Sequence, residues 1–153
     1  MRKLALFTII VLAGITAIPG LAQSGSKEGR AGQFTGAWHL LWLEEPDANG
    51  NVHRADCTGL LVYTSDGHMS VQVMYRNPHS QSGGVQYAAG GYEASYGRFE
   101  VDDDHTFTYH VDGALVRTLI GKDLKRTYEI SGKQMIVKSP DPNEHWRVAW
   151  EKD

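Results

Sequence analysis

Hydrophobic and polar residues alternate most regularly over residues 58–75, which read TGLLVYTSDGHMSVQVMY. Met69, Val71, Val73 and Tyr75 occupy every second position, which is the period of a β-strand with one buried face. The turn before them, at 65–67, contains Asp and Gly, which readily adopt the backbone angles of tight turns. The pattern therefore predicts a β-hairpin around which the rest of the fold is organised.

Other short segments on both sides of this hairpin have the composition of strands. We predict strands at 34–43, 96–101, 106–111, 122–130, 134–138 and 144–151, in addition to the two of the hairpin. Residues 44–56 and 76–84 are expected to be polar connections. Alanines and tyrosines recur at helical spacing over 85–95, so a short helix or turn is predicted there.

Strands that follow one another without intervening helices favour antiparallel pairing. Eight such strands wound up and down can close into a barrel, which leaves no exposed sheet edge. We therefore predict an all-β fold, an eight-stranded antiparallel up-and-down barrel, with a β-sandwich as the alternative. A barrel of this size is either filled by side chains or holds one small ligand.

The first 22 residues have the layout of a secretory signal peptide. Two basic residues precede a long apolar run, and small residues follow it at the expected cleavage position. We expect cleavage before Gln23, a flexible leader over 23–33, a barrel domain over 34–153, and a periplasmic or secreted protein without an integral membrane span. An uncleaved N-terminal anchor is the alternative.

Composition and charge narrow the classes of partner and cofactor. The net charge is −3 and no run of Lys or Arg occurs, so we expect no nucleic-acid partner. Cys57 is the single cysteine, which excludes an internal disulfide, and we interpret it as a buried or half-buried thiol. The seven histidines form no H-E-x-x-H motif, and we predict neither a metal site nor a cofactor.

A set of short motifs resembles a known family. Gly36-Ala37-Trp38 forms a G-x-W triplet on the first predicted strand. Further matching pieces are 59–63 (GLLVY), 66–70 (DGHMS), 96–99 (YGRF), 110–112 (HVD), Gly121, Arg126 and 146–147 (WR). Their order is similar to that of the lipocalin-like domains of bacterial and fungal proteins. The resemblance implies a calycin-type barrel, small-molecule binding, and a Trp38 that closes one end and packs near a late Arg, either Arg147 or Arg126.

Aromatic and polar residues on the predicted strands are the candidates for a ligand site. Aromatic rings offer large apolar area with polar edges, which suits a cavity wall, although they can equally fill a solid core. An inward Arg126 would need an anionic partner, whereas an exposed or internally paired Arg126 is the alternative. His110 lies either outside or on a polar cavity wall. The candidates are Trp38, Tyr75, Tyr96, Tyr109, His110, Arg126, Tyr128 and Trp146.

These observations favour a barrel that binds a small hydrophobic or amphiphilic molecule. The alternative is an enzyme that uses the same cavity, such as an isomerase, cyclase or hydratase. His110 or Tyr109 would then act as acid or base, and Arg126 would hold an anionic group. A barrel filled by its own side chains is the third possibility.

Overall fold

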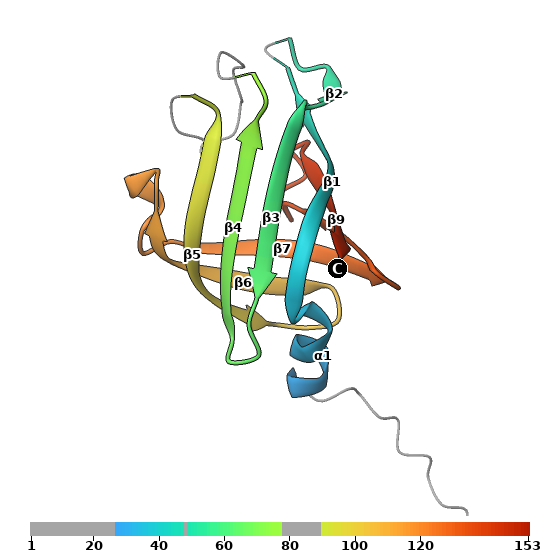
Figure 1. The fold of residues 1–153 in the computed structure, drawn as a ribbon, viewed down its shortest axis with the longest axis vertical. Helices are drawn as coiled ribbons and strands as arrows, with labels where there is room; N and C mark the ends of the chain where they lie inside the picture. Colours follow the sequence, from blue (N-terminus) through green and yellow to red (C-terminus); the bar gives the residue numbers. More distant parts are fainter. Residues whose placement is uncertain (1–26, 48, 78–89) are drawn as a thin grey trace, which may run out of the picture.

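Apart from one short extra strand, strands that are neighbours in sequence pair with each other in the computed structural model, which describes residues 27–47, 49–77 and 90–153 (Figure 1). All the pairs are antiparallel. The strands are β1 (Gly36–Pro46), β2 (Val52–Arg54), β3 (Cys57–Tyr63), β4 (His68–Tyr75), β5 (Tyr92–Val101), β6 (Thr106–Ala114), β7 (Asp123–Ser131), β8 (Gln134–Lys138) and β9 (Arg147–Lys152). A short 3₁₀ helix, η1 (Arg117–Leu119), follows β6.

Pairing between β1 and β9 closes the sheet into a barrel. Its register runs from Trp38 opposite Lys152 to Glu44 opposite Arg147. β2 pairs only with the far end of β1, so eight strands form the closed barrel and β2 is a three-residue extension. The predicted eight-stranded antiparallel up-and-down barrel is therefore confirmed, and the β-sandwich alternative is wrong.

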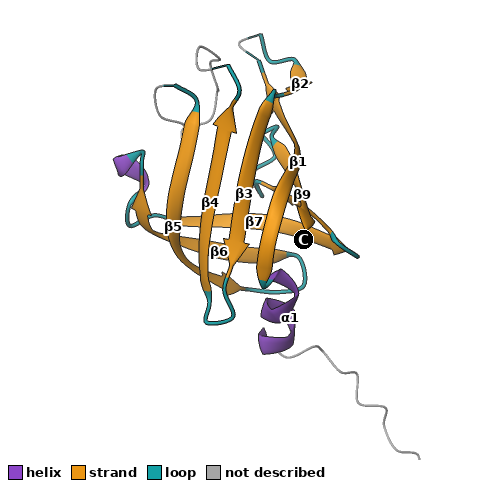
Figure 2. Ribbon diagram, in the orientation of Figure 1, coloured by secondary structure: helices purple, strands orange, loops and turns teal. Residues whose placement is uncertain are grey.

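One helix, α1 (Lys27–Phe34), precedes β1 and lies across one end of the barrel (Figure 2). We refer to this end as the closed end. We expected a flexible leader over 23–33, but its residues from 27 onwards belong to this helix. The helix forms because Phe34, the residue directly after the predicted leader, is fully buried in the barrel and holds the helix in place. Among the described residues, no helix is long and apolar enough to cross a bilayer.

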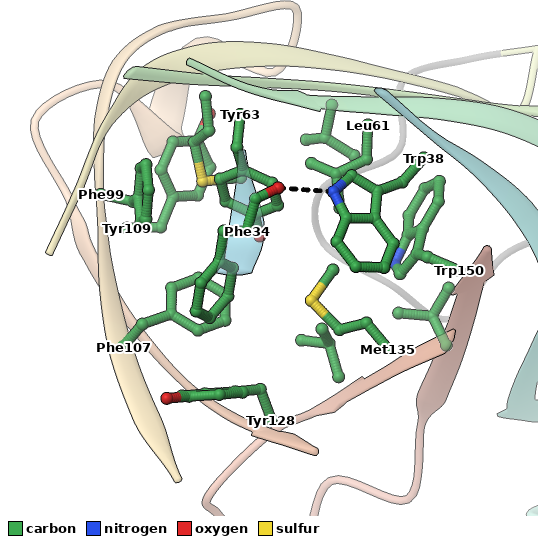
Figure 3. Packing of buried hydrophobic residues seen from close by; sticks show 14 of the residues in the cluster. Phe34, Trp38, Leu61, Tyr63, Phe99, Phe107, Tyr109, Tyr128, Met135 and Trp150 are labelled. Atoms are coloured by element: carbon green, nitrogen blue, oxygen red, sulfur yellow. Dashed lines mark hydrogen bonds between the residues drawn. The ribbon is translucent and has the colours of Figure 1, made fainter. Parts of the chain in front are cut away.

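Phe34 is the centre of an aromatic cluster that fills the closed end (Figure 3). Its ring lies 5.1 Å from that of Tyr63, 5.5 Å from that of Phe107 and 4.7 Å from that of Tyr128, all at steep interplanar angles. Such edge-to-face pairs contribute about 0.5–1.5 kcal/mol each beyond the burial of area. Packing at this end is therefore dense, and any open space in the barrel must lie further along its axis.

Two local predictions are wrong. Residues 92–95 belong to β5, whereas we predicted a helix or turn over 85–95, of which 85–89 lie outside the described residues. Gly90 and Gly91 both have positive φ and form a turn that leads directly into the strand. The predicted connection over 44–56 also contains β2, whose three residues are all exposed and gave no alternating pattern.

Candidate functional site

A cavity of about 290 Å³ lies inside the barrel, beyond the aromatic cluster of the closed end. Its wall is mainly apolar, because most inward positions of the strands carry aliphatic or aromatic side chains. Leu61, Met69, Val71, Val73, Val137 and Val148 form much of this wall. The volume lies at the lower limit of typical small-molecule sites, which are roughly 300–1,000 Å³. The barrel therefore has an interior that is neither completely filled nor large.

The cavity extends from the closed end to the opposite end, which we call the mouth. Tyr63 and Phe107, which contact Phe34, line its floor. Glu93 at the start of β5 and Glu144 before β9 line the other end. Because Glu144 is exposed to solvent, the cavity opens at the mouth.

A stacked pair of side chains lies at the mouth. The Arg126 guanidinium lies over the Trp146 ring, 5.2 Å from its centroid, and donates a hydrogen bond of 2.9 Å to the Lys125 carbonyl. The Trp146 indole N–H donates in turn to Glu144, over 3.0 Å. Burial lowers the pKa of Arg126, and Glu144 and Glu93 oppose this effect. An arginine remains protonated under such conditions, so the cavity contains a permanent cation.

Glu93 is a site residue that the sequence analysis missed. Its side chain lines the same cavity as Arg126, yet no ion pair joins the two in the described part of the chain. Burial raises the pKa of Glu93 to about 7, and the charge of Arg126 partly offsets this increase. A carboxylic acid in an apolar cavity is expected to behave in this way, because burial disfavours its charged form.

Two polar atoms of the cavity wall have no hydrogen-bond partner among the described residues: the Tyr109 hydroxyl and the Trp150 indole N–H. Both residues are buried, with exposed fractions of 5% and 2%. Burial raises the pKa of Tyr109 to about 12, while the nearby Ser95 side chain acts in the opposite direction without completing a hydrogen bond of normal geometry. Buried polar groups generally have partners, so these two atoms favour an occupant with polar atoms.

Three of the eight predicted ligand-binding residues line this cavity: Tyr109, Arg126 and Trp146. Trp38 and Tyr128 are buried at the closed end, where Trp38 donates to the Phe34 carbonyl over 2.7 Å and Tyr128 donates to the Asp103 carbonyl over 3.1 Å. Tyr75 is also buried, but its hydroxyl donates to the buried Glu45 carboxylate. These three rings are parts of the core rather than of the cavity wall.

Tyr96 and His110 lie on the outside of the barrel. Tyr96 is 60% exposed, and its ring covers Gly113 on the neighbouring strand. His110 Nδ1 lies 2.6 Å from a carboxylate oxygen of Asp123, which is itself exposed. Neither residue lines the cavity, so His110 is not available as an acid or base for a molecule inside it.

The cation near Trp38 is neither of the two arginines that the resemblance indicated. Lys152, directly opposite Trp38 in the barrel seam, places its ammonium group 5.2 Å from the Trp38 ring and 3.1 Å from the Gln33 carbonyl. Arg147 instead pairs with Glu44 and stacks on Trp42, and Arg126 lies at the mouth. The closed end is thus sealed by a lysine at the end of β9.

Other reactive groups offer little chemistry. Cys57 is half-buried, as expected, and burial is the main reason that its pKa is raised to about 11. A thiol of this kind is protonated and unreactive at neutral pH. Within the described ranges, no three His, Cys, Asp or Glu side chains converge on a point where a metal ion could bind.

Comparison with known proteins identifies a family and distant structural neighbours. The family described as "lipocalin-like domain" matches residues 35–152. The chain is similar to a solved redesigned β-barrel (10% identity, 81% of this chain and 95% of that one, TM-score 0.44). It is also similar to an uncharacterised protein from Bacteroides eggerthii (16% identity, 78% and 99%, TM-score 0.48). No curated protein sequence matches significantly.

Proposed function

Because this chain belongs to the lipocalin-like domain family, we propose that it binds a small, partly apolar molecule in the central cavity of its barrel. The observation that supports this proposal most directly is the cavity itself, which combines an aliphatic wall with a few convergent polar groups. The aliphatic wall suits the hydrocarbon part of a ligand. Arg126 and Tyr109 offer hydrogen-bond donors to its polar part.

We further propose that Arg126 binds the polar head of an amphiphile. Its guanidinium is stacked on Trp146, which restricts its movement, and no carboxylate forms an ion pair with it among the described residues. A charge-assisted hydrogen bond to a ligand would contribute roughly 1.5–3 kcal/mol. The hydrocarbon part of the same amphiphile would then extend along the aliphatic wall towards the closed end.

Titration with octanoate and 1-octanol tests this proposal, with Trp146 and Trp150 as fluorescent reporters in the cavity wall. Both probes should bind at pH 6. In Arg126→Gln, the affinity for octanoate should fall about tenfold to a hundredfold, because the charged partner is lost, while the affinity for octanol should change little. Equal losses for both probes would mean that Arg126 supports the fold rather than the ligand.

A variant with a filled cavity is the control for binding elsewhere. Val73 is 3% exposed and lines the cavity wall, so Val73→Phe places a larger side chain in the ligand space. A folded Val73→Phe variant, checked by circular dichroism, should lose affinity for both probes. If its affinity is unchanged, the probes bind outside the barrel and the proposal fails.

An enzyme that uses the same cavity is the second candidate function, and one observation favours it. Glu93 has a pKa of about 7, and this is the range in which a general acid or base works best at neutral pH. Glu93 would replace His110 in that role, since His110 lies outside the barrel. A change in the mass of a bound compound during incubation, abolished in Glu93→Gln, would support this candidate.

The protein is further proposed to act outside the cytoplasm, in the periplasm or as a secreted protein. The proposal depends on residues 1–22, where two basic residues precede an apolar run and small residues follow.

A further inference from the structure

The cavity brings a small number of ionisable groups together in an apolar environment. Glu93 enters from β5, Arg126 from β7, Tyr109 from β6 and Tyr63 from β3, while Glu144 lies at the exposed rim. The residues of β4 that line the cavity, Met69, Val71 and Val73, are apolar. Burial raises the pKa of both tyrosines, so they stay neutral at physiological pH. Besides Glu144 at the rim, whose charge also acts on Arg126, the charge balance inside the cavity depends on one cation, Arg126, and one carboxyl group, Glu93.

We propose that this site binds a ligand with a carboxylate head beside Arg126 while Glu93 is held as a neutral acid, so that binding takes up one proton. This inference rests on the proposed ligand-binding function and names the ligand class and the linked proton. A ligand carboxylate and an ionised Glu93 would place two negative charges beside one guanidinium in a cavity of about 290 Å³. Two carboxylates that share such a site generally retain one proton between them.

The geometry leaves room for this arrangement. Glu93 and Arg126 line the same cavity and interact electrostatically without forming an ion pair, so a ligand carboxyl group that accepts hydrogen bonds from Arg126 also lies within the electrostatic range of Glu93. A neutral Glu93 can donate its own O–H to the same ligand head, whereas an ionised Glu93 can only accept. The proton comes from solvent and remains between Glu93 and the ligand.

The pH dependence follows with a definite sign. Below the pKa of Glu93, which is about 7, the residue already carries its proton and octanoate binding is independent of pH. Above it, each binding event must take up a proton, and the affinity falls towards about tenfold per pH unit. Between pH 6.5 and 8.5 the octanoate affinity should therefore fall by about 25-fold. Octanol, which has no charge, should show no such decrease.

Isothermal titration calorimetry of the full folded domain with octanoate measures the proton directly. Two buffers of different ionisation enthalpy at pH 8 should show an uptake of about 0.9 proton per octanoate bound. In Glu93→Gln the uptake should vanish, and the affinity should be the same at pH 6.5 and 8.5. Glu129→Gln is the matched control, because Glu129 is an exposed carboxylate on the outside of β7, where it faces Lys138; its uptake should match that of the wild type.

Each outcome decides between the proposals. Octanoate binding without proton uptake, or an uptake that persists in Glu93→Gln, overturns the role of Glu93 and leaves the proposed ligand-binding function intact. Octanol binding without octanoate binding overturns the carboxylate as the ligand class. If neither probe binds to the wild type at pH 6, both the proposed function and this inference fail.

Discussion

Trp38 joins the helix to the barrel through a single side chain. It is fully buried, its indole N–H donates to the carbonyl of Phe34, and the Lys152 ammonium group lies over its ring. The residue therefore connects α1, β1 and β9 at the closed end. Its loss would loosen the helix and the barrel seam together.

Truncation of Trp38 should therefore strongly destabilise the protein. We expect Trp38→Ala to lower the free energy of unfolding by roughly 3–5 kcal/mol, as measured by chemical denaturation. Trp42→Ala is the comparison, because Trp42 is only half-buried and its contacts are with Arg54 and Arg147 on the outer face. Trp42→Ala should lower the free energy of unfolding by about 1 kcal/mol. If the two variants lost similar amounts of unfolding free energy, Trp38 at the closed end would contribute no more to stability than an outer-face tryptophan.

At the residue scale, the sequence predicted which residues are structurally important better than which face they occupy. Tyr96 lies an odd number of positions before the buried Phe99 and Val101, so its outward position was readable from parity. Glu93 was missed because its segment was interpreted as a helix or turn, and an isolated acidic residue there carries no signal. Lys152 was missed because the register between the first and last strands decides which cation meets Trp38.

At the scale of elements, the pairing of β5 with β6 depends on one glycine. The register shifts between Tyr96 and Gly97, and the backbone of β6 lies unusually close to Gly97 at that bulge. A Cβ atom placed on Gly97 would lie 1.9 Å from the His110 carbonyl oxygen and 2.8 Å from the Asp112 nitrogen. Since both atoms belong to the backbone, neither can move without disrupting the sheet.

Gly97→Ala should therefore destabilise the protein by about 3 kcal/mol or more, with a corresponding decrease in the denaturation midpoint. Gly32→Ala is the matched control, because Gly32 lies in α1 and, apart from the helix's own backbone, no heavy atom lies within 4 Å of the position that an added Cβ would occupy. Alanine is the better helix former, so this variant should gain about 0.5–1 kcal/mol. A Gly97→Ala protein with wild-type stability would refute the close approach of the two strands.

The strands themselves were largely predictable because alternation of apolar and polar residues reports a half-buried sheet directly. The hairpin over 58–75 corresponds to β3 and β4, and the later strands lie close to their expected positions, although β5 begins four residues before the predicted start at 96. Elements that lack this alternation were not predicted from the sequence. β2 is fully exposed, and α1 is stabilised by the burial of Phe34 rather than by a helical pattern of its own.

At the scale of the whole molecule, the eight sequential strands in the sequence predicted a barrel. They did not predict whether the interior of the barrel is filled. Whether a barrel of eight strands is filled depends on how side chains from all strands pack together, which no local pattern records. Here the aromatic residues concentrate at the closed end and aliphatic residues surround the remaining space. The distinction between a filled core and a cavity therefore required the three-dimensional arrangement.

Processing of the precursor is a prediction at this scale. If residues 1–22 are a signal peptide, the exported protein should begin at Gln23, and intact-mass spectrometry should find only this form outside the cytoplasm. Helix α1 begins at Lys27, so cleavage before Gln23 leaves it complete. Detection of the full-length chain in the membrane fraction would instead support an uncleaved anchor.

The seam between β1 and β9 also determines when the protein can fold. Glu44 and Arg147, which pair across it, are 103 positions apart, and β9 follows all the other strands among the described residues. A nascent chain that lacks this strand has two unpaired edges and an apolar interior open to solvent, which makes it prone to aggregation. Closure late in synthesis keeps the chain unfolded for longer. The same pairing that closes the finished barrel thus delays its completion until β9 has been synthesised.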